Sequence, residues 1–537
     1  MSRPWTTALA AAVLAAGVAA PTLGFDFPKW DDVRYITANP ILDEPLGTCL
    51  KWAVSGPRFQ AYHPVHHAAL CLQFPMSGSN PFGYRLVSLL LFALLGAAVA
   101  SWLRAEKLDA LPALIVTALV IGHPLHSESL GSVISQKDLL AMLFGVLALR
   151  GAAVGRSRLL VLALVLLAGL SKSGYLMFAF VVFARDWCLE GLDLKAALRR
   201  NAAGCLVAAA AMALSVAVVS QSGLPHNATQ WMNPLIIAST VSHYMIALLV
   251  PVGLVPVQCL QVGGLRIAAG FVVLVAAVVI AVRRKGWLGF GLLAALFGIA
   301  PYLNVVPVPL GAPTRFMPLF GLGAAVACVP LTRTPRRRAA AIVAAVALIA
   351  LSLANQRIWR DPLTLWTFTS SQSRCYAVPF ANLSVTRFEA GDHTGAEEAL
   401  IDAISIEPHN ERLYRSLVFS YMLTGDCGPA TSVEDAQTFF NQIPSSEHPV
   451  RAALAGKRLA SALVLALRHE KALRRSTEPI PAPIRSIVPN VRACNPDRGA
   501  KLEYLIDRLN GQAQKSGVTA SGAQDVLTSS TTPPARP

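Results

Sequence analysis

The chain has 537 residues, of which 54% are hydrophobic and only 14% are charged, and its formal net charge is +16. This composition excludes an ordinary soluble protein, because apolar runs of about 20 residues are typical of membrane spans. It also argues against nucleic-acid binding, since the basic residues fall mainly in short loops between apolar runs, where positive-inside topology places them.

Eleven apolar runs predict about eleven spanning helices and an all-α, polytopic helical bundle over residues 1–354. The runs cover residues 5–24, 86–103, 110–122, 138–150, 159–170, 175–187, 201–220, 267–282, 287–302, 316–331 and 339–354. The first run also resembles a secretory signal, although we favour a retained helix. Residues 236–256 are apolar too, but two prolines and the charge pattern of later loops indicate a re-entrant or surface-lying helix.

A cytoplasmic N-terminus places every basic loop in the cytoplasm. The large first loop 25–85, the loops 123–137, 221–266 and 303–315, and everything after residue 355 then lie outside. The Ala/Leu/Val-rich, Arg-rich composition indicates a bacterial inner membrane, with the C-terminal part in the periplasm. Disulfides such as Cys49–Cys71 or Cys427–Cys494 are permitted there. The other cysteines near apolar runs are read as small hydrophobes: Cys188, Cys205, Cys259 and Cys328.

A water-soluble helical domain is predicted over residues 355–512. Residues 377–410 fit a tetratricopeptide (TPR) repeat of about 34 residues, and a second partial repeat follows one period later. A generic helical hairpin is the alternative. Further helices are expected at 432–475 and 500–512, and the Ser/Thr/Gly/Pro-rich residues 513–537 are predicted to be disordered.

The sharpest polar motif is the adjacent pair Asp31 and Asp32, just after the first apolar run. Neighbouring carboxylates raise each other's proton affinity, so one of them could act as a general base. An Asp pair that simply forms a turn or a helix cap is the alternative.

A second motif reads His123-Pro-Leu-His126-Ser-Glu128, between two predicted spans. Ionisable groups so close to a bilayer are functional by default. We predict catalytic roles for His126 and Glu128 and substrate binding for His123. A divalent metal is possible at this spacing but is not expected, and interfacial groups that face water are the alternative.

Four further residues form a basic group on the same predicted side: His63, Lys137, Lys172 and Arg315. Such cations can hold a phosphate through charge-assisted hydrogen bonds. Side chains that snorkel to lipid headgroups are the alternative. The absence of a nucleotide-binding loop in the sequence argues against a soluble sugar nucleotide as donor.

The combination of motifs resembles the transmembrane and TPR-containing protein O-mannosyltransferases (TMTC-like) and their bacterial relatives, which are GT-C glycosyltransferases. The matching stretches are WDDVRYITANP at 30–40, YHP at 62–64, HPLHSESLGSVISQKD at 123–138, SKSG at 171–174, PTRFMPL at 313–319 and NQRIWRDPLTLW at 355–366. This sequence departs from the family at Thr314-Arg315-Phe316, where relatives often have Asp-Arg-Tyr.

The resemblance implies a polyprenyl-phosphate-linked sugar donor and a hydroxyl acceptor, often Ser or Thr of a protein, with inversion and no cofactor. By this resemblance Asp31 and Asp32 hold or deprotonate the acceptor, and Lys137 and Arg315 lie near the lipid phosphate. A non-catalytic membrane scaffold that recruits a partner through its TPR domain is the alternative, and a transporter is less favoured, because the polar residues gather at one mouth of the bundle.

Overall fold

The computed structural model describes residues 4–59, 61–220, 233–304 and 314–407, together with Leu413 and Ser416. The regular secondary structure of these residues is helical, with no β-strand among them. The chain divides into two compact units, Met1–Ser373 and Arg374–Pro537. The helices expected at 432–475 and 500–512, the second TPR repeat, the pair Cys427–Cys494 and the tail 513–537 all lie outside the described residues.

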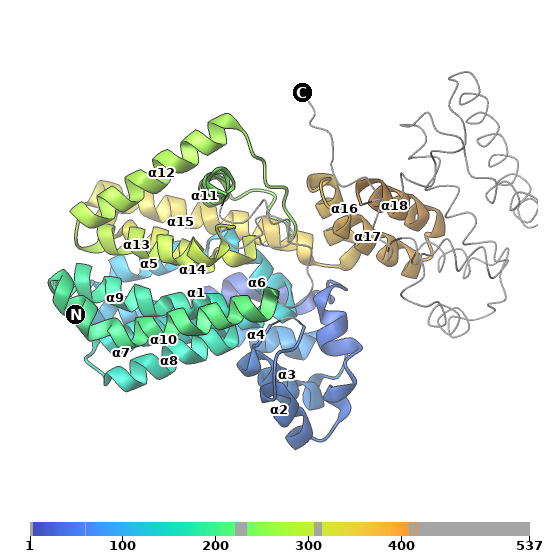
Figure 1. The fold of residues 1–537 in the computed structure, drawn as a ribbon, viewed down its shortest axis with the longest axis horizontal. Helices are drawn as coiled ribbons and strands as arrows, with labels where there is room; N and C mark the ends of the chain where they lie inside the picture. Colours follow the sequence, from blue (N-terminus) through green and yellow to red (C-terminus); the bar gives the residue numbers. More distant parts are fainter. Residues whose placement is uncertain are drawn as a thin grey trace, which may run out of the picture. The chain divides into compact units, whose positions relative to one another are not determined.

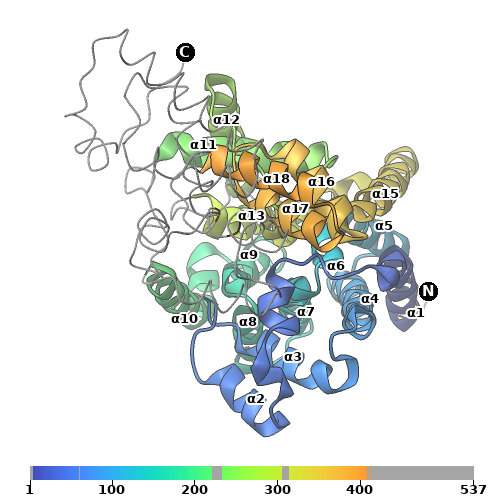
Figure 2. The same ribbon diagram turned by 90° about the vertical axis from the view of Figure 1, so that its right-hand side faces the viewer.

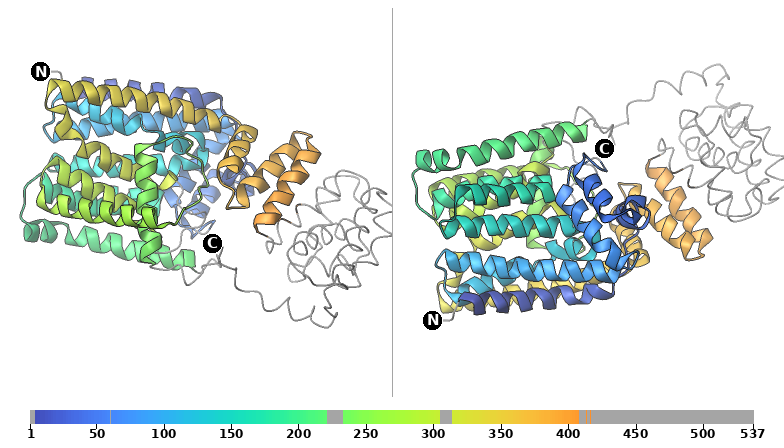
Figure 3. Two further views of the ribbon diagram at one scale, coloured as in Figure 1. Left: turned by 90° about the horizontal axis from the view of Figure 1, so that it is seen from above. Right: turned by 90° about the horizontal axis from the view of Figure 1, so that it is seen from below.

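The helices of the first unit are, in chain order, α1 (Pro4–Ala19), α2 (Leu46–Val54), α3 (Pro64–Ser77), α4 (Pro81–Ala105), α5 (Ala110–Ile121), α6 (Ser127–Gly131), α7 (Gln136–Ala153), α8 (Arg158–Ser171), α9 (Phe178–Cys188), α10 (Leu194–Ser220), α11 (Pro234–Leu249), α12 (Gly264–Arg283), α13 (Trp287–Ile299), α14 (Pro318–Ala327), α15 (Pro335–Gln356) and α16 (Pro362–Gln372). Most of the long helices lie side by side in one bundle (Figure 1). The N-terminus lies at one end of that bundle, and α2 and α3 lie at the other (Figure 3).

Five helices of the described chain are long and apolar enough to cross a membrane: Pro4–Gly24, Pro81–Ala105, Leu194–Ala217, Gly264–Arg283 and Pro335–Trp359. A bent pair of helices raises this number to six if it counts as one span. The eleven expected spans are therefore not all present as full-length helices. At 1.5 Å rise per residue, the shorter apolar helices such as α8 and α14 cover less than a hydrocarbon core of about 30 Å.

The segment after α5 corrects the expectation of a simple loop at 123–137. The chain bends by 50° between Ile121 and Pro124 and continues as helix to Gly131. Residues 121–136 are all buried. Polar groups of this segment therefore lie inside the bundle, where other protein groups must satisfy them.

Helix α11 runs across the bundle and not along it, since Figure 1 shows it end-on while its neighbours lie across the view. It packs tightly on α12, where a Cβ added to Gly270 would fall 1.8 Å from the carbonyl oxygen of Ala238. With 16 residues it is not among the candidate spans. That residues 236–256 do not cross the membrane stays a prediction.

Helices α13 and α14 touch backbone to backbone. A Cβ added to Gly323 would lie 2.2 Å from the Ala295 nitrogen, and one added to Gly291 would lie 2.4 Å from the Ala327 nitrogen. Small residues allow such close approach between membrane helices.

At the end of the bundle that carries the N-terminus, buried ion pairs join Arg185 to Glu106 at 2.7 Å and to Asp186 at 2.9 Å.

In the described part of the second unit, α17 (Val378–Glu389) and α18 (His393–Ile406) are joined by a short turn and pack on each other. Asp392 caps α18 by accepting a hydrogen bond from the Gly395 amide. A helix pair is what the repeat predicted at 377–410 requires, but assignment to a TPR array stays a prediction.

Candidate functional site

Arg85 joins the first polar motif to the second. Its guanidinium is fully buried in α4 and donates to the carbonyls of Phe25 (2.7 Å) and Asp26 (2.5 Å). It also donates to the carbonyls of Leu130 and Gly131 at 3.1–3.2 Å. The start of the acidic segment and the end of α6 are thereby held around one side chain.

The segment that follows α15 packs against the same two regions. Trp366 donates from Nε1 to the Pro28 carbonyl at 2.8 Å, and its ring meets Trp30 edge-on at 5.5 Å. A Cβ on Gly131 would lie 2.3 Å from Trp359, so only glycine fits there. The stretches 30–40, 123–138 and 355–366 thus meet in one place, and Figure 2 shows this end of the bundle facing the viewer.

The two adjacent aspartates have different environments. Asp32 is 1% exposed, and its carboxylate accepts from the amides of Lys29 (3.0 Å) and Trp30 (3.2 Å). Burial raises the pKa of the Asp32 carboxyl, against the opposing effect of these amide bonds. Asp31 is half-buried and makes no such turn. Asp32 therefore fits the turn-forming alternative, whereas Asp31 remains accessible.

Arg315 lies between the acidic segment and α6. Its Nη1 is 3.7 Å from Glu128 Oε1, and its guanidinium lies 5.1 Å from the centre of the Trp30 ring. Glu128 is 5% exposed, and its second oxygen has no hydrogen-bond partner among the described residues. The charges of Arg315, Lys172, Asp138 and Lys137 all act on this carboxylate. The site is therefore a buried cluster of mixed charge.

Lys172 is already paired. Its Nζ lies 2.5 Å from Asp138 Oδ1, to which the Tyr175 hydroxyl also donates at 2.9 Å. The ammonium group is thus neutralised inside the protein. The pairing of Asp138 with Lys172 could not be predicted from the sequence, because 34 residues separate them. The only sequence signal for Asp138 is its position in a polar segment.

Lys137 and His63 border the acidic segment. Lys137 Nζ lies 5.5 Å from the centre of the Tyr35 ring, and no acidic partner of Lys137 occurs in the described part of the chain. Lys137, Asp31, Arg34 and Arg315 all act electrostatically on the Tyr35 hydroxyl. His63 is 8% exposed, and burial with the nearby charges of Lys137 and Lys172 lowers the pKa of its imidazole well below the usual range. His63 is therefore neutral and not a cation.

The histidines of the second motif lie on or next to the short turn Pro124–His126, which packs against the turn Thr314–Phe316 that carries Arg315. His123 uses both ring nitrogens on the backbone: Nδ1 accepts from the Leu125 amide at 3.2 Å, and Nε2 lies 3.0 Å from the Leu248 carbonyl oxygen. His126 is buried against Phe92, with ring centres 5.3 Å apart. Because these bonds occupy both ring nitrogens of His123, its expected substrate-binding role stays a prediction, as does the catalytic role expected of His126.

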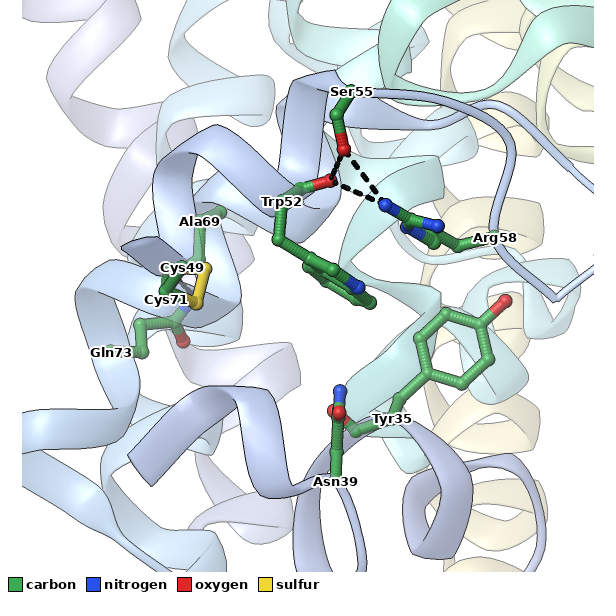
Figure 4. The surroundings of a disulfide bond; sticks show 9 residues. All are labelled: Tyr35, Asn39, Cys49, Trp52, Ser55, Arg58, Ala69, Cys71 and Gln73. Carbon is green, nitrogen blue, oxygen red and sulfur yellow. Dashed lines mark hydrogen bonds between the residues drawn. A yellow bond between two sulfur atoms is a disulfide. The ribbon is translucent and has the colours of Figure 1, made fainter. Parts of the chain in front are cut away.

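A disulfide between Cys49 and Cys71, one of the permitted pairings, ties α2 to α3 (Figure 4). Cys259, expected to be a free apolar cysteine, is disulfide-bonded as well. Beside the first bond, the buried His66 and His67 have no hydrogen-bond partner for either ring nitrogen among the described residues. Tyr35 and Trp52 flank His67 at 5.6 and 5.3 Å between ring centres.

Residues that sequence reasoning missed include Arg85, Asp138, Tyr175 and Tyr302. Arg85 carries the clearest signal in retrospect, because a charged residue at the start of an apolar run is costly in a membrane unless it has a role. No group of three or more side chains suited to hold a metal ion occurs among the described residues.

The chain is similar over part of its length to one curated relative, Protein O-mannosyl-transferase TMTC1 of Mus musculus. The two are 28% identical over 130 residues, which is 22% of this chain and 14% of the relative. No protein-family model matches the chain, and no solved structure matches it. The likeness to an O-mannosyltransferase is thus distant and partial.

Proposed function

We propose that this membrane protein is a glycosyltransferase that moves a sugar from a polyprenyl-phosphate-linked donor to the hydroxyl of an acceptor. One observation carries the proposal: Arg315 lies 3.7 Å from the buried Glu128 carboxylate and 5.1 Å from the centre of the Trp30 ring, and Trp30 is followed in the chain by the half-buried Asp31. In this proposal the nearby cations bind an anion and Asp31 is the base. The partial likeness to an O-mannosyltransferase supports the same reaction class.

In the proposed reaction the acceptor oxygen attacks the anomeric carbon of the sugar as the carbon–oxygen bond to phosphate breaks. Asp31 takes the acceptor proton, because it is the accessible carboxylate of the pair. Arg315 and Lys137 receive the departing phosphate, which leaves with the electron pair of the broken bond. A single displacement of this kind inverts the anomeric centre.

Asp32 and Glu128 have supporting roles in this proposal. The amide hydrogen bonds to Asp32 fix the turn at residues 29–32 and hence the direction of Asp31. Glu128 orients Arg315, and its free Oε2 is available to a bound hydroxyl. His123 and His126 contact the backbone and Phe92, and the substrate-binding role of His123 and the catalytic role of His126 stay predictions.

We place the site on the extracytoplasmic side of a bacterial inner membrane, with the N-terminus in the cytoplasm. This side suits a lipid-linked donor, a Ser or Thr acceptor on an extracytoplasmic protein, and the Cys49–Cys71 disulfide. Residues 1–354 form the GT-C-like membrane domain of this proposal. Residues 355–512 form the TPR-like periplasmic domain, which guides the acceptor or a protein partner.

The test uses the purified full-length protein in detergent with a panel of polyprenyl-phosphate sugars and extracytoplasmic proteins as acceptors. Mass spectrometry of the acceptors detects transfer. Asp31→Asn should abolish transfer, and Asp43→Asn, which changes an exposed carboxylate of the same loop, should leave it intact. Equal transfer by Asp31→Asn and the wild-type protein would refute the assignment, and absence of transfer with every donor would favour the scaffold alternative.

A further inference from the structure

The break between α8 and α9 delivers the side chains of Lys172 and Tyr175 to the interior of the bundle. Lys172 leaves the helix in an extended conformation (φ −157°, ψ 120°), and a short 3-10 turn, Ser173–Met177, follows. Lys172, Gly174 and Tyr175 are all buried. A break of this kind frees backbone groups and costs stability in a membrane helix, so the interior contacts must compensate for it.

The Lys172 ammonium contacts the turn that carries Arg315. Besides its 2.5 Å ion pair with Asp138, Lys172 Nζ donates to the Arg315 carbonyl oxygen at 3.4 Å. It also lies 4.9 Å from the centre of the Phe316 ring, within the range of a cation–π interaction. One side chain therefore holds two successive residues of the short helical turn Thr314–Phe316.

The break between α8 and α9 also contacts Tyr302, which precedes the turn Thr314–Phe316 in the chain. The Phe316 ring stacks on Tyr302 with centres 4.2 Å apart and an angle of 6°. Gly174 lies under the Tyr302 hydroxyl, where an added Cβ would fall 1.8 Å from the oxygen. Residues 172–175 thus fix Tyr302 and Phe316 together.

We propose that the buried Lys172–Asp138 ion pair is a positioning device, which aims the Arg315 guanidinium at Glu128 by holding the Arg315 carbonyl and the Phe316 ring. The proposal replaces the expectation that Lys172 binds phosphate itself. It rests on the proposed function only in that Arg315 is taken to hold the leaving phosphate. Lys172 and Asp138 are positioning residues, since they act through Arg315.

The first readout needs no turnover. Phenylglyoxal modifies accessible arginine side chains, and mass spectrometry of the peptide with Arg315 gives the rate in the full-length protein. Asp138→Asn and Lys172→Met should each raise the rate at Arg315 at least fivefold. The double variant, which leaves no unpaired charge buried, should raise it equally and guards against loss of folding.

The matched control is Glu106→Gln, which breaks the buried ion pair of Arg185 at the other end of α9. It should leave the reactivity of Arg315 unchanged. Unchanged reactivity in the Lys172 and Asp138 variants, or an equal rise in the control, would overturn the positioning role.

The second readout is steady-state transfer. Lys172→Met should lower kcat at least tenfold with a smaller change in the KM of the donor, and Lys172→Arg should restore part of the loss. If Arg315 reactivity rises but no donor supports transfer, the positioning inference stands and the proposed function fails. If Asp31→Asn abolishes transfer but Arg315 reactivity is unchanged in Lys172→Met, the reverse holds.

Discussion

Replacing Arg85 by methionine tests whether this side chain assembles the candidate site. Methionine fills part of the same volume but leaves four carbonyls without their donor: the buried ones of Phe25, Leu130 and Gly131 and the partly buried one of Asp26. An unsatisfied buried group costs about 1–3 kcal/mol. Removing the buried charge of Arg85 recovers part of its desolvation cost. We therefore use the low end of this range, about 1 kcal/mol, for each carbonyl. The expected loss is then about 4 kcal/mol, a large share of the roughly 5–15 kcal/mol that holds a typical domain together.

The assay is unfolding of the purified protein in detergent by heat and by denaturant. For a unit that spans Met1–Ser373, a loss of about 4 kcal/mol corresponds to a decrease in Tm of roughly 5 °C. Arg85→Lys keeps the charge but lacks the planar fork of donors, so it should recover only part of the loss. Arg104→Met is the control near the other end of α4, where the side chain makes a single hydrogen bond to the Leu108 carbonyl. Stability of Arg85→Met within 1 kcal/mol of the wild-type value would refute this reasoning.

Three further predictions concern stability around the same loops. Replacing Cys49 and Cys71 by alanine should lower the free energy of unfolding by about 3 kcal/mol, because the disulfide closes a loop of 22 residues. Denaturation in the presence and absence of reductant checks this prediction, and an equal effect of reductant on the variant and the wild-type protein would contradict it. Gly131→Ala should destabilise the protein by about 1–3 kcal/mol through overpacking on Trp359. In a double-mutant cycle, Trp359→Leu should recover part of that loss. Additive losses would show that the two residues do not meet. Burial lowers the pKa of the His67 imidazole to about 4. Stability should therefore decrease as the pH falls from 6.5 towards 4, by up to roughly 3 kcal/mol, because the unfolded chain binds the proton first. His67→Gln should flatten the decrease in Tm over that interval, and an unaltered pH profile would contradict the assignment.

The sequence was sufficient to predict a helical membrane protein, because apolar runs and the spacing of basic loops report directly on a bilayer. It was less informative about residues 123–137, which have the composition of a loop yet form a buried, bent helical segment. Composition records that polar groups are present but not where their partners are. The short helices raise the same difficulty, since an apolar run does not reveal the break that ends it.

The candidate site was likewise only partly predictable from the sequence. Arg315, Glu128 and Asp31 were selected as rare ionisable groups near apolar runs, and the structure brings Arg315 and Glu128 to 3.7 Å. The roles expected of Lys172 and His123 could not be judged from sequence, because their partners are Asp138 and the Leu248 carbonyl. Such partners are distant in sequence and carry no spacing signal.

The hydrogen bond from Trp366 to the Pro28 carbonyl joins residues 338 positions apart. At typical rates of synthesis of 5–20 residues per second, the later partner emerges well over ten seconds after the earlier one. During that interval the acidic segment has left the translation machinery without the contact that locates it. A chain terminated before residue 366 therefore retains the five candidate membrane helices of the described residues but cannot complete this contact. The candidate site is thus one of the last parts of the first unit to be assembled during biosynthesis.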